Sequence, residues 1–159
     1  MSSKSLAPSR GGEEAIDRCY TISEFASAFG MDRSTARYRL SNLAKAGVIS
    51  VRKVGPLYIY CPPSGGNVLT SEMARRVVKT AAKNLRSILA TARGWPSIST
   101  SDLLGSGAPS VWRGFIKELI SWILASEEGD CMERGREIIC PRRVWEEILQ
   151  RLEEGKIVV

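Results

Sequence analysis

The sequence of 159 residues contains no histidine, and none of its four cysteines forms a Cys-x-x-Cys pair. Zinc sites are built mostly from these two residue types at such spacings, so a zinc site of the usual kinds is not expected. The chain also lacks a histidine to act as general base, a glycine-rich phosphate-binding loop and a cysteine with a histidine partner. We therefore expect neither an enzyme nor a bound cofactor or metal.

Long apolar runs are absent as well. The apolar runs are far too short to cross a bilayer, and the N-terminus has no apolar segment of the signal-peptide type. Amide side chains are scarce, with one Gln and three Asn beside sixteen Arg, a composition that weakly indicates a thermophile. We expect a soluble, cytoplasmic protein that does not associate with membranes.

The four cysteines are Cys19, Cys61, Cys131 and Cys140. In an intracellular protein such residues most often act as small buried apolar side chains, and this is the interpretation we favour. Intracellular proteins of hyperthermophiles are an exception, because they do form disulfides. A Cys19–Cys61 bridge therefore stays open as the alternative.

Positive charge is abundant but unevenly distributed along the chain, whose formal net charge is +6. From Arg18 to Arg93 there are thirteen Lys and Arg residues and three acids. From Gly94 to the end there are eight bases and eleven acids. The first half suits a polyanionic partner such as nucleic acid, and the second half does not.

Residues 31–47 have the pattern of a short basic helix with both ends marked. Asp32 is a candidate N-cap and Gly47 a candidate C′ residue, which predicts a helix over 33–46. At 3.6 residues per turn, its apolar and polar residues fall on opposite sides. The apolar stripe contains Ala36, Leu40, Leu43, Ala44 and Gly47, and the other side contains Ser34, Arg37, Tyr38, Ser41 and Lys45.

The neighbouring segments predict a helix before this one and a hairpin after it. Thr21-Ile22-Ser23-Glu24 has the Thr-x-x-Glu pattern of a capping box, and Gly30 ends the helix that follows. Two short helices joined by a glycine-containing turn make a helix-turn-helix. Residues 48–54 and 57–61 then predict two β-segments around Gly55-Pro56.

Helix, turn, helix and a hairpin with bases near its tip resemble the winged helix-turn-helix domains of bacterial and archaeal transcription regulators. The resemblance covers roughly residues 15–63. Its most specific part is the phrase Arg-Ser-Thr-Ala-Arg-Tyr-Arg-Leu-Ser-Asn-Leu-Ala-Lys-Ala-Gly-Val-Ile at 33–49. The resemblance implies that helix 33–46 enters the major groove of DNA and that the wing at 51–58 meets the backbone.

The residues expected to contact DNA are Arg33, Ser34, Thr35, Arg37, Tyr38, Ser41, Lys45, Arg52 and Lys53. Arg33 and Arg37 can each present a bidentate fork to guanine O6 and N7. The bases near the wing tip are better placed for the backbone or the minor groove. Arg39 is interpreted as an ordinary exposed base.

A long amphipathic helix is expected over 70–92, with Thr70 as its cap. Its apolar residues stack on one face, and its bases gather on the other. Arg75, Arg76, Lys79 and Lys83 on that basic face are candidate phosphate contacts. The alternatives are an ordinary solvated face and a dimerisation helix.

The second half partly repeats the first. Ser, Arg and Leu recur in place when residues 110–119 are aligned with 34–43, and Ile-x-Cys-Pro ends both candidate hairpins. A short helix near 101–104, a hairpin around Arg134-Gly135 and a closing helix over 142–154 complete the pattern. Because Trp112, Phe115 and Trp122 make the second copy apolar and its wing is acidic, we expect this half to bind protein.

The sequence thus predicts a mainly α fold with small β-hairpin wings, an α+β class with two tandem winged helix-turn-helix copies joined by a long helix. The expected parts are a disordered tail (1–11), a DNA-binding domain (12–63), a linker (64–69) and a degenerate winged-helix or helical dimerisation domain (70–159). The expected function is sequence-specific binding of double-stranded DNA by a homodimeric transcription regulator. The alternative is a tandem winged-helix adaptor in a chromosome-segregation, replication-initiation or transcription complex, which binds protein through its C-terminal half.

Overall fold

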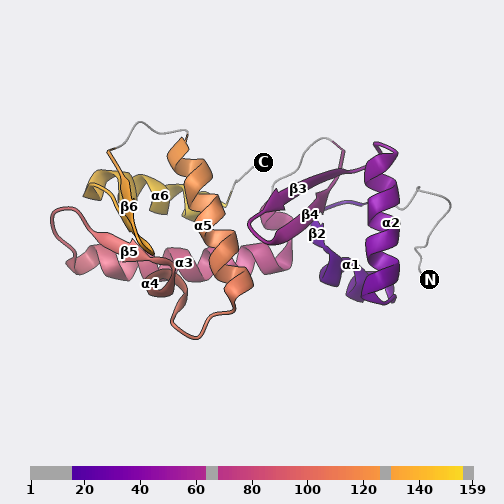
Figure 1. Cartoon of the computed structure of the whole chain (residues 1–159), viewed down its shortest axis with the longest axis horizontal. Helices are drawn as coiled ribbons and strands as arrows, with labels where there is room; N and C mark the ends of the chain where they lie inside the picture. The colour runs from indigo at the N-terminus through magenta and orange to yellow at the C-terminus, as the bar shows by residue number, and fades with distance from the viewer. Residues whose placement is uncertain (1–15, 64–67, 126–129, 156–159) are drawn as a thin grey trace. The chain divides into compact units, whose positions relative to one another are not determined.

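The computed structural model describes residues 16–63, 68–125 and 130–155 (Figure 1). These residues form six α-helices, one 3₁₀ turn and two three-stranded sheets, so the α+β class is confirmed. The described chain divides into two compact units, the first with residues 16–53, 58–63 and 68–73 and the second with 54–57, 74–125 and 130–155. The predicted tail (1–11) lies outside the described residues.

The first unit contains a small sheet and two helices. Its elements are β2 (Tyr20–Thr21), α1 (Ile22–Phe29), α2 (Arg33–Lys45), β3 (Ser50–Val54), β4 (Leu57–Cys61) and the 3₁₀ turn η1 (Val68–Thr70). The strand order is β2-β4-β3, with Tyr20 paired to Tyr60 in antiparallel register. The bounds of the two helices and of the hairpin strands were predicted to within two residues. The pairing of β2 with β4 was not predicted.

The caps of both short helices are confirmed. The Thr21 hydroxyl accepts from the backbone N–H of Glu24 at 3.2 Å, and Glu24 Oε1 accepts from the N–H of Thr21 at 2.9 Å. Asp32 Oδ1 accepts from the N–H of Thr35 at 2.7 Å and so caps α2. Gly47, with φ of +76°, takes the left-handed conformation that ends a helix.

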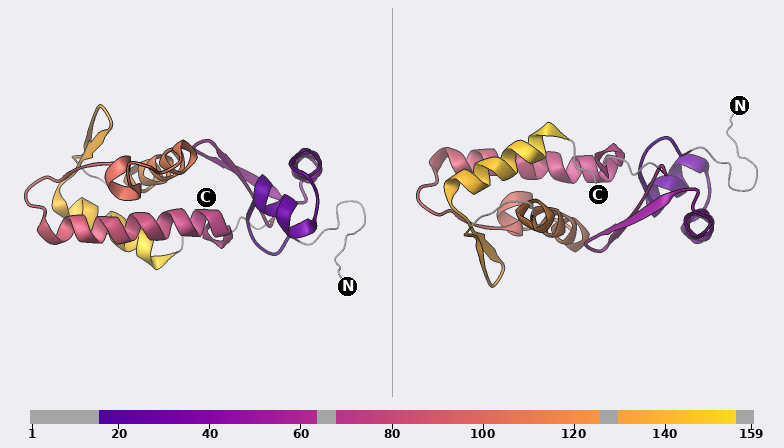
Figure 2. Two further views of the ribbon diagram at one scale, coloured as in Figure 1. Left: turned by 90° about the horizontal axis from the view of Figure 1, so that it is seen from below. Right: turned by 90° about the horizontal axis from the view of Figure 1, so that it is seen from above.

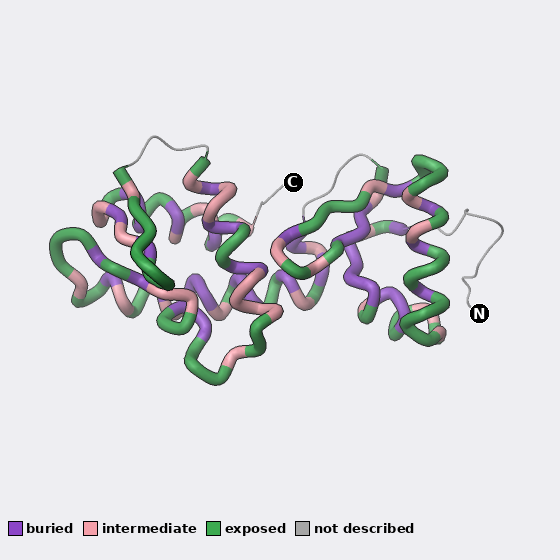
Figure 3. The backbone as a smooth tube through the Cα atoms, in the orientation of Figure 1, coloured by how far each residue is buried: buried purple, intermediate pink, exposed green. Residues whose placement is uncertain are grey.

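The core of the first unit forms where α1 and α2 meet the sheet. Phe25, Ala36 and Leu40 are fully buried, and the cluster continues to Tyr60. The Phe25 ring lies 4.6 Å, centroid to centroid, from the ring of Phe29. The apolar stripe of α2 therefore faces inward, and its polar side faces outward (Figure 3).

Glu24 makes further bonds that the capping pattern alone does not indicate. Its Oε1 also accepts from the Ser71 hydroxyl at 2.7 Å, and its Oε2 accepts from the N–H of Met73 at 2.6 Å. Met73 lies in the first turn of α3 (Glu72–Thr91). Thr70 was wrongly expected to cap this helix, which begins two residues later, and its hydroxyl accepts from the N–H of Cys19 at 2.6 Å.

The predicted linker (64–69) is only partly described. Residues 64–67 lie outside the described ranges, and Val68 and Leu69 are buried residues of η1. Their burial makes them part of the folded structure around the start of α3 rather than an open connection.

The second unit contains most of α3 and seven further segments of the chain. Its other elements are β5 (Ser97–Ser99), α4 (Thr100–Leu104), α5 (Ser110–Ala125), β6 (Met132–Arg134), β7 (Glu137–Ile139) and α6 (Arg142–Glu154), together with the turn at 54–57. Figure 2 shows α3 and α6 side by side, with α5 on one side of this pair. The β6–β7 hairpin extends away from the helices on the same side as α5. The predicted closing helix (142–154) is confirmed with the same bounds.

The core of the second unit is held by large apolar side chains and a few polar bonds. Phe115 and Trp145 are fully buried, and the indole N–H of Trp145 donates to the backbone carbonyl of Pro96 at 3.0 Å. At the surface, outside this core, Arg86 of α3 pairs with Glu153 of α6 at 2.6 Å. Phe115 therefore serves folding, whereas Trp112 and Trp122 are half-buried.

The two units repeat one order of elements. Each runs strand, helix, helix, strand, strand, and in each the first strand pairs with the last. A capping box precedes the first helix in both, formed by Thr21 with Glu24 and by Ser99 with Asp102. A brief extended piece at Cys19-Tyr20 was predicted before the first helix, and β2 lies there, whereas β5 of the second sheet was not predicted.

The cysteines form two disulfides, Cys19–Cys61 and Cys131–Cys140. The favoured interpretation of four small apolar side chains is therefore wrong, although Cys19, Cys61 and Cys140 are also buried. Cys19 lies directly before β2 and Cys61 ends β4, so strand pairing brings them together.

Across the described ranges, every helix is too short or too polar to cross a membrane.

We predict that removing the Cys19–Cys61 disulfide lowers stability more than removing Cys131–Cys140. The closed loops span 42 and 9 residues, and loop-closure entropy then gives losses of about 4 and about 2.5 kcal/mol. Urea unfolding of the two double Cys→Ala variants measures the difference. Alkylation of four free thiols in the denatured, unreduced protein would contradict the pairing.

Candidate nucleic-acid interface

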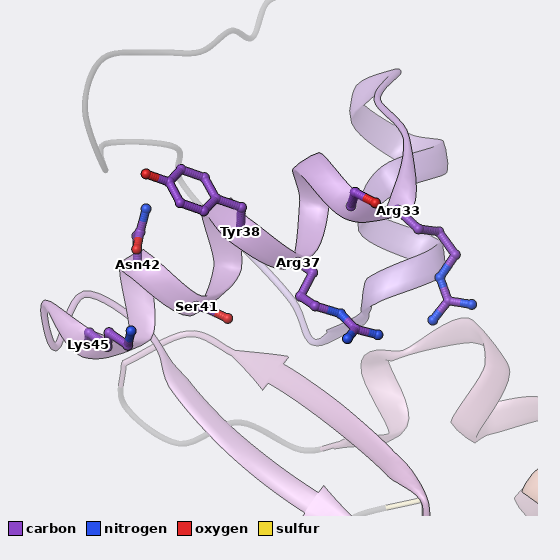
Figure 4. A pocket seen from close by; sticks show the side chains of 7 residues that line it. Arg33, Arg37, Tyr38, Ser41, Asn42 and Lys45 are labelled. Carbon is purple, nitrogen blue, oxygen red and sulfur yellow. The ribbon is translucent and has the colours of Figure 1, made fainter.

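The outward side of α2 carries two parallel rows of polar residues. Residues four apart on a helix lie one above the other, so each row follows one ridge of the helix surface. The rows are Arg33-Arg37-Ser41-Lys45 and Ser34-Tyr38-Asn42. All seven residues line one shallow hollow of about 540 Å³ (Figure 4). The structure thus brings together six of the nine residues predicted to contact DNA.

The side chains of the two rows differ in direction and chemistry. Figure 4 shows the guanidinium groups of Arg33 and Arg37 on the same side of α2, with the Tyr38 ring and Asn42 on the other. Tyr38 is 70% exposed, more than any other large hydrophobic side chain of the described residues. The surface therefore offers forked donors, an aromatic ring, hydroxyls and an amide at one place.

The charges around the hollow have one sign. None of the seven lining residues is acidic, whereas three carry positive charge. Asp32, at the helix start, is occupied by its bonds from Thr35, and these bonds lower the pKa of its carboxyl group. Burial raises the pKa of the Tyr60 hydroxyl, and the nearby charge of Arg37 partly opposes that rise. Because Tyr60 belongs to β4, the guanidinium group of Arg37 lies near the sheet as well as beside the hollow.

Asn42 was not predicted to contact DNA, although it lines the hollow. The signal was present in the sequence, because Asn42 lies four residues after Tyr38 and eight after Ser34. Thr35, by contrast, does not line the hollow, and its N–H belongs to the cap of α2. Arg39 is exposed and also lies outside the lining.

The remaining predicted bases lie on other elements. Arg52 and Lys53 are exposed on β3, and Lys53 Nζ lies 5.8 Å from the ring centroid of the exposed Tyr58 on β4. Neither base lines the hollow. The candidate phosphate contacts of α3 are exposed: Arg75, Arg76, Lys79 and Lys83.

Over the residues with described positions, no group of three or more His, Cys, Asp or Glu side chains could hold a metal ion.

Comparison with known proteins adds little. No family model matches the chain, and no curated protein matches it. Among solved structures, it is similar to a hypothetical protein of Pyrobaculum spherical virus, with 15% sequence identity and a TM-score of 0.49. The likeness covers 80% of this chain and 88% of the viral one. At this level of likeness, no property of the viral protein is transferred to this chain.

We predict that the residues of the hollow contribute little to folding. Arg37→Ala and Tyr38→Ala should each change the free energy of unfolding by no more than about 0.5 kcal/mol, because both side chains are exposed. Leu40→Ala, two positions after Tyr38 but fully buried, should cost about 3 kcal/mol. Urea unfolding measures all three. A large loss in the first two variants would mean that these residues serve the fold instead of a partner.

Proposed function

We propose that this protein is a sequence-specific double-stranded DNA-binding protein, acting as a transcription regulator through α2. One observation carries the proposal. A capped helix with a fully packed inner stripe presents Arg33, Arg37, Lys45 and an exposed Tyr38 around one hollow with no acidic lining. Polyanion binding needs this concentration of cations, and base reading needs rigid placement of the donors.

The dimensions of α2 suit the major groove of DNA. Its thirteen residues correspond to about 20 Å of helix, and B-DNA admits an α-helix into its major groove, which is about 12 Å wide. In this pose the N-terminal half lies nearest the base edges, where Arg33 and Arg37 each offer two donors to guanine O6 and N7. Ser34, Ser41 and Lys45 then reach bases or phosphates. Tyr38 packs on a sugar or a thymine methyl group.

We interpret the β3–β4 hairpin as a wing beside this helix. Arg52 and Lys53 are exposed on β3, and we assign them to the DNA backbone or the minor groove. The shared order of strand, helix, helix, strand, strand supports the interpretation of both units as winged helices. We assign the exposed cations of α3 to additional phosphate contacts, and residues 70–159 to homodimerisation.

The second unit differs from the first in the features that DNA binding requires. On α5, Arg113 is half-buried and Lys117 is exposed, and the helix carries no other base. Its β6–β7 hairpin exposes Glu133 and Glu137 beside Arg134 and Arg136, so it lacks the net positive charge that attracts a polyanion. This difference favours a second candidate function, that of a tandem winged-helix adaptor whose second unit binds a protein partner. Glu127 and Glu128, two further acids that precede this hairpin in the sequence, lie outside the described residues.

We predict a strong salt dependence for duplex binding. With five or six phosphates neutralised, log K should fall with log salt concentration at a slope of about −5. Arg37→Ala should weaken binding to a selected duplex by about 10- to 100-fold, the value of one bidentate base contact. Arg39→Ala is the matched control, on the same helix but outside the hollow, and should change affinity by less than about threefold.

Fluorescence anisotropy over a salt series measures these effects, after selection of bound sequences from random DNA. Binding that ignores both salt and Arg37→Ala would overturn the proposal. A folded protein that binds no duplex at all would favour the adaptor.

A further inference from the structure

The second unit contains a polar hollow that the proposed DNA contact does not use. Its volume is about 760 Å³, larger than the hollow over α2. All its lining residues are polar or charged: Ser99, Thr100, Ser101, Asp102, Ser106, Arg113, Arg136 and Glu137. They come from β5, α4, α5, the connection between α4 and α5, and the β6–β7 hairpin. Small-molecule sites are usually mostly apolar, so this lining selects an unusually polar ligand.

The two carboxylates of the hollow are held by bonds within the unit. Asp102 Oδ2 accepts from the backbone N–H of Ser99 at 2.9 Å, as part of the capping box of α4. Glu137 Oε1 accepts from the Ser97 hydroxyl. A carboxylate has lone pairs for several donors, so both groups can still accept from a ligand hydroxyl.

The two guanidinium groups approach from different elements. Arg113 on α5 is half-buried, and its Nη1 donates to the backbone carbonyl of Ala108 at 2.6 Å. That bond anchors the group and uses one of its five donors. Arg136 follows Gly135, whose φ of +62° makes the tight turn between β6 and β7. The hollow therefore combines one anchored guanidinium, that of Arg113, with the exposed guanidinium of Arg136 and several hydroxyl groups.

We propose that this hollow binds a small ligand carrying a phosphate group and neighbouring hydroxyls, of the sugar phosphate class. Guanidinium forks match phosphate oxygens in pairs, and Ser and Thr hydroxyls add further donors. The carboxylates of Asp102 and Glu137 accept from the sugar hydroxyls. The absence of aromatic residues from the lining disfavours a nucleobase, which would stack on them.

This hollow differs from the surface of α2 in the net charge of its lining residues. Two arginines and two acids line it, so its lining is electrically balanced, whereas the lining over α2 has only positive charges. A balanced site lacks the counterion-release gain that draws a polyanion, and it favours a small ligand with one phosphate group. The proposal does not depend on DNA binding by the first unit.

The test is a titration of the full-length ¹⁵N-labelled protein followed by NMR. Ribose 5-phosphate is the probe, and inorganic phosphate and ribose are its two parts. We expect ribose 5-phosphate to shift the amides of Thr100, Ser101, Arg113 and Arg136 selectively, with inorganic phosphate weaker and ribose weakest. No selective shift at millimolar concentrations would overturn the proposal. Selective shifts of these amides by duplex DNA and not by the sugar phosphate would assign the hollow to nucleic acid instead.

Variants of the hairpin make the test specific. Arg136→Gln should weaken ribose 5-phosphate binding by about tenfold or more, because it removes a charged fork from an exposed position without disturbing the core. Arg113→Gln should do the same. Arg134→Gln, in the same hairpin but outside the lining, should change affinity by less than about twofold. Equal affinity in the wild type and in both lining variants would contradict the assignment.

Discussion

Helix α2 can pack in one orientation only, because its apolar residues form a single narrow stripe. That stripe fills the core of the first unit, with Ala36 and Leu40 completely buried beside Phe25. A rotation by one residue would expose Leu40, at a cost of about 2 kcal/mol, and would direct Arg39 toward the core at a greater cost. The side that carries Arg37 and Tyr38 is therefore fixed outward. The proposed contact of α2 with DNA depends on this packing, because it places the basic side chains outward.

The polar bonds around α1 support the same arrangement. Glu24 accepts from Thr21 at the start of α1 and from Ser71 and Met73 at the start of α3, so one carboxylate orders two chain segments. Asp102 occupies the corresponding place in the second unit and makes the local capping bond. The two units thus repeat an order of elements but present different surfaces. The first offers only positive charge over α2, and the second offers a balanced polar hollow.

Local patterns predicted much of this fold. Capping signals at Thr21 and Asp32 located the starts of α1 and α2, because each cap depends on residues three positions apart. The strand pairing of Tyr20 with Tyr60 joins residues 40 positions apart (60 − 20), a contact that no local pattern specifies. The start of α3 was misplaced for the same reason, since a distant residue, Glu24, bonds its first turn. For the site, the basic row of α2 was predicted, and the helical spacing that links Asn42 to Tyr38 was present in the sequence, but the hollow beside Arg113 required the folded structure.

Sequence-specific binding through α2 requires its side chains to reach base edges in the major groove. Methylation interference tests this most directly, because dimethyl sulfate modifies guanine N7 in that groove, where an arginine fork would bind. On duplexes selected by the wild-type protein, we expect methylation of particular guanines to prevent binding, and Arg37→Ala to remove the effect of at least one of them. Unchanged binding to fully methylated duplexes, with loss of binding when a ligand fills the minor groove, would contradict the account.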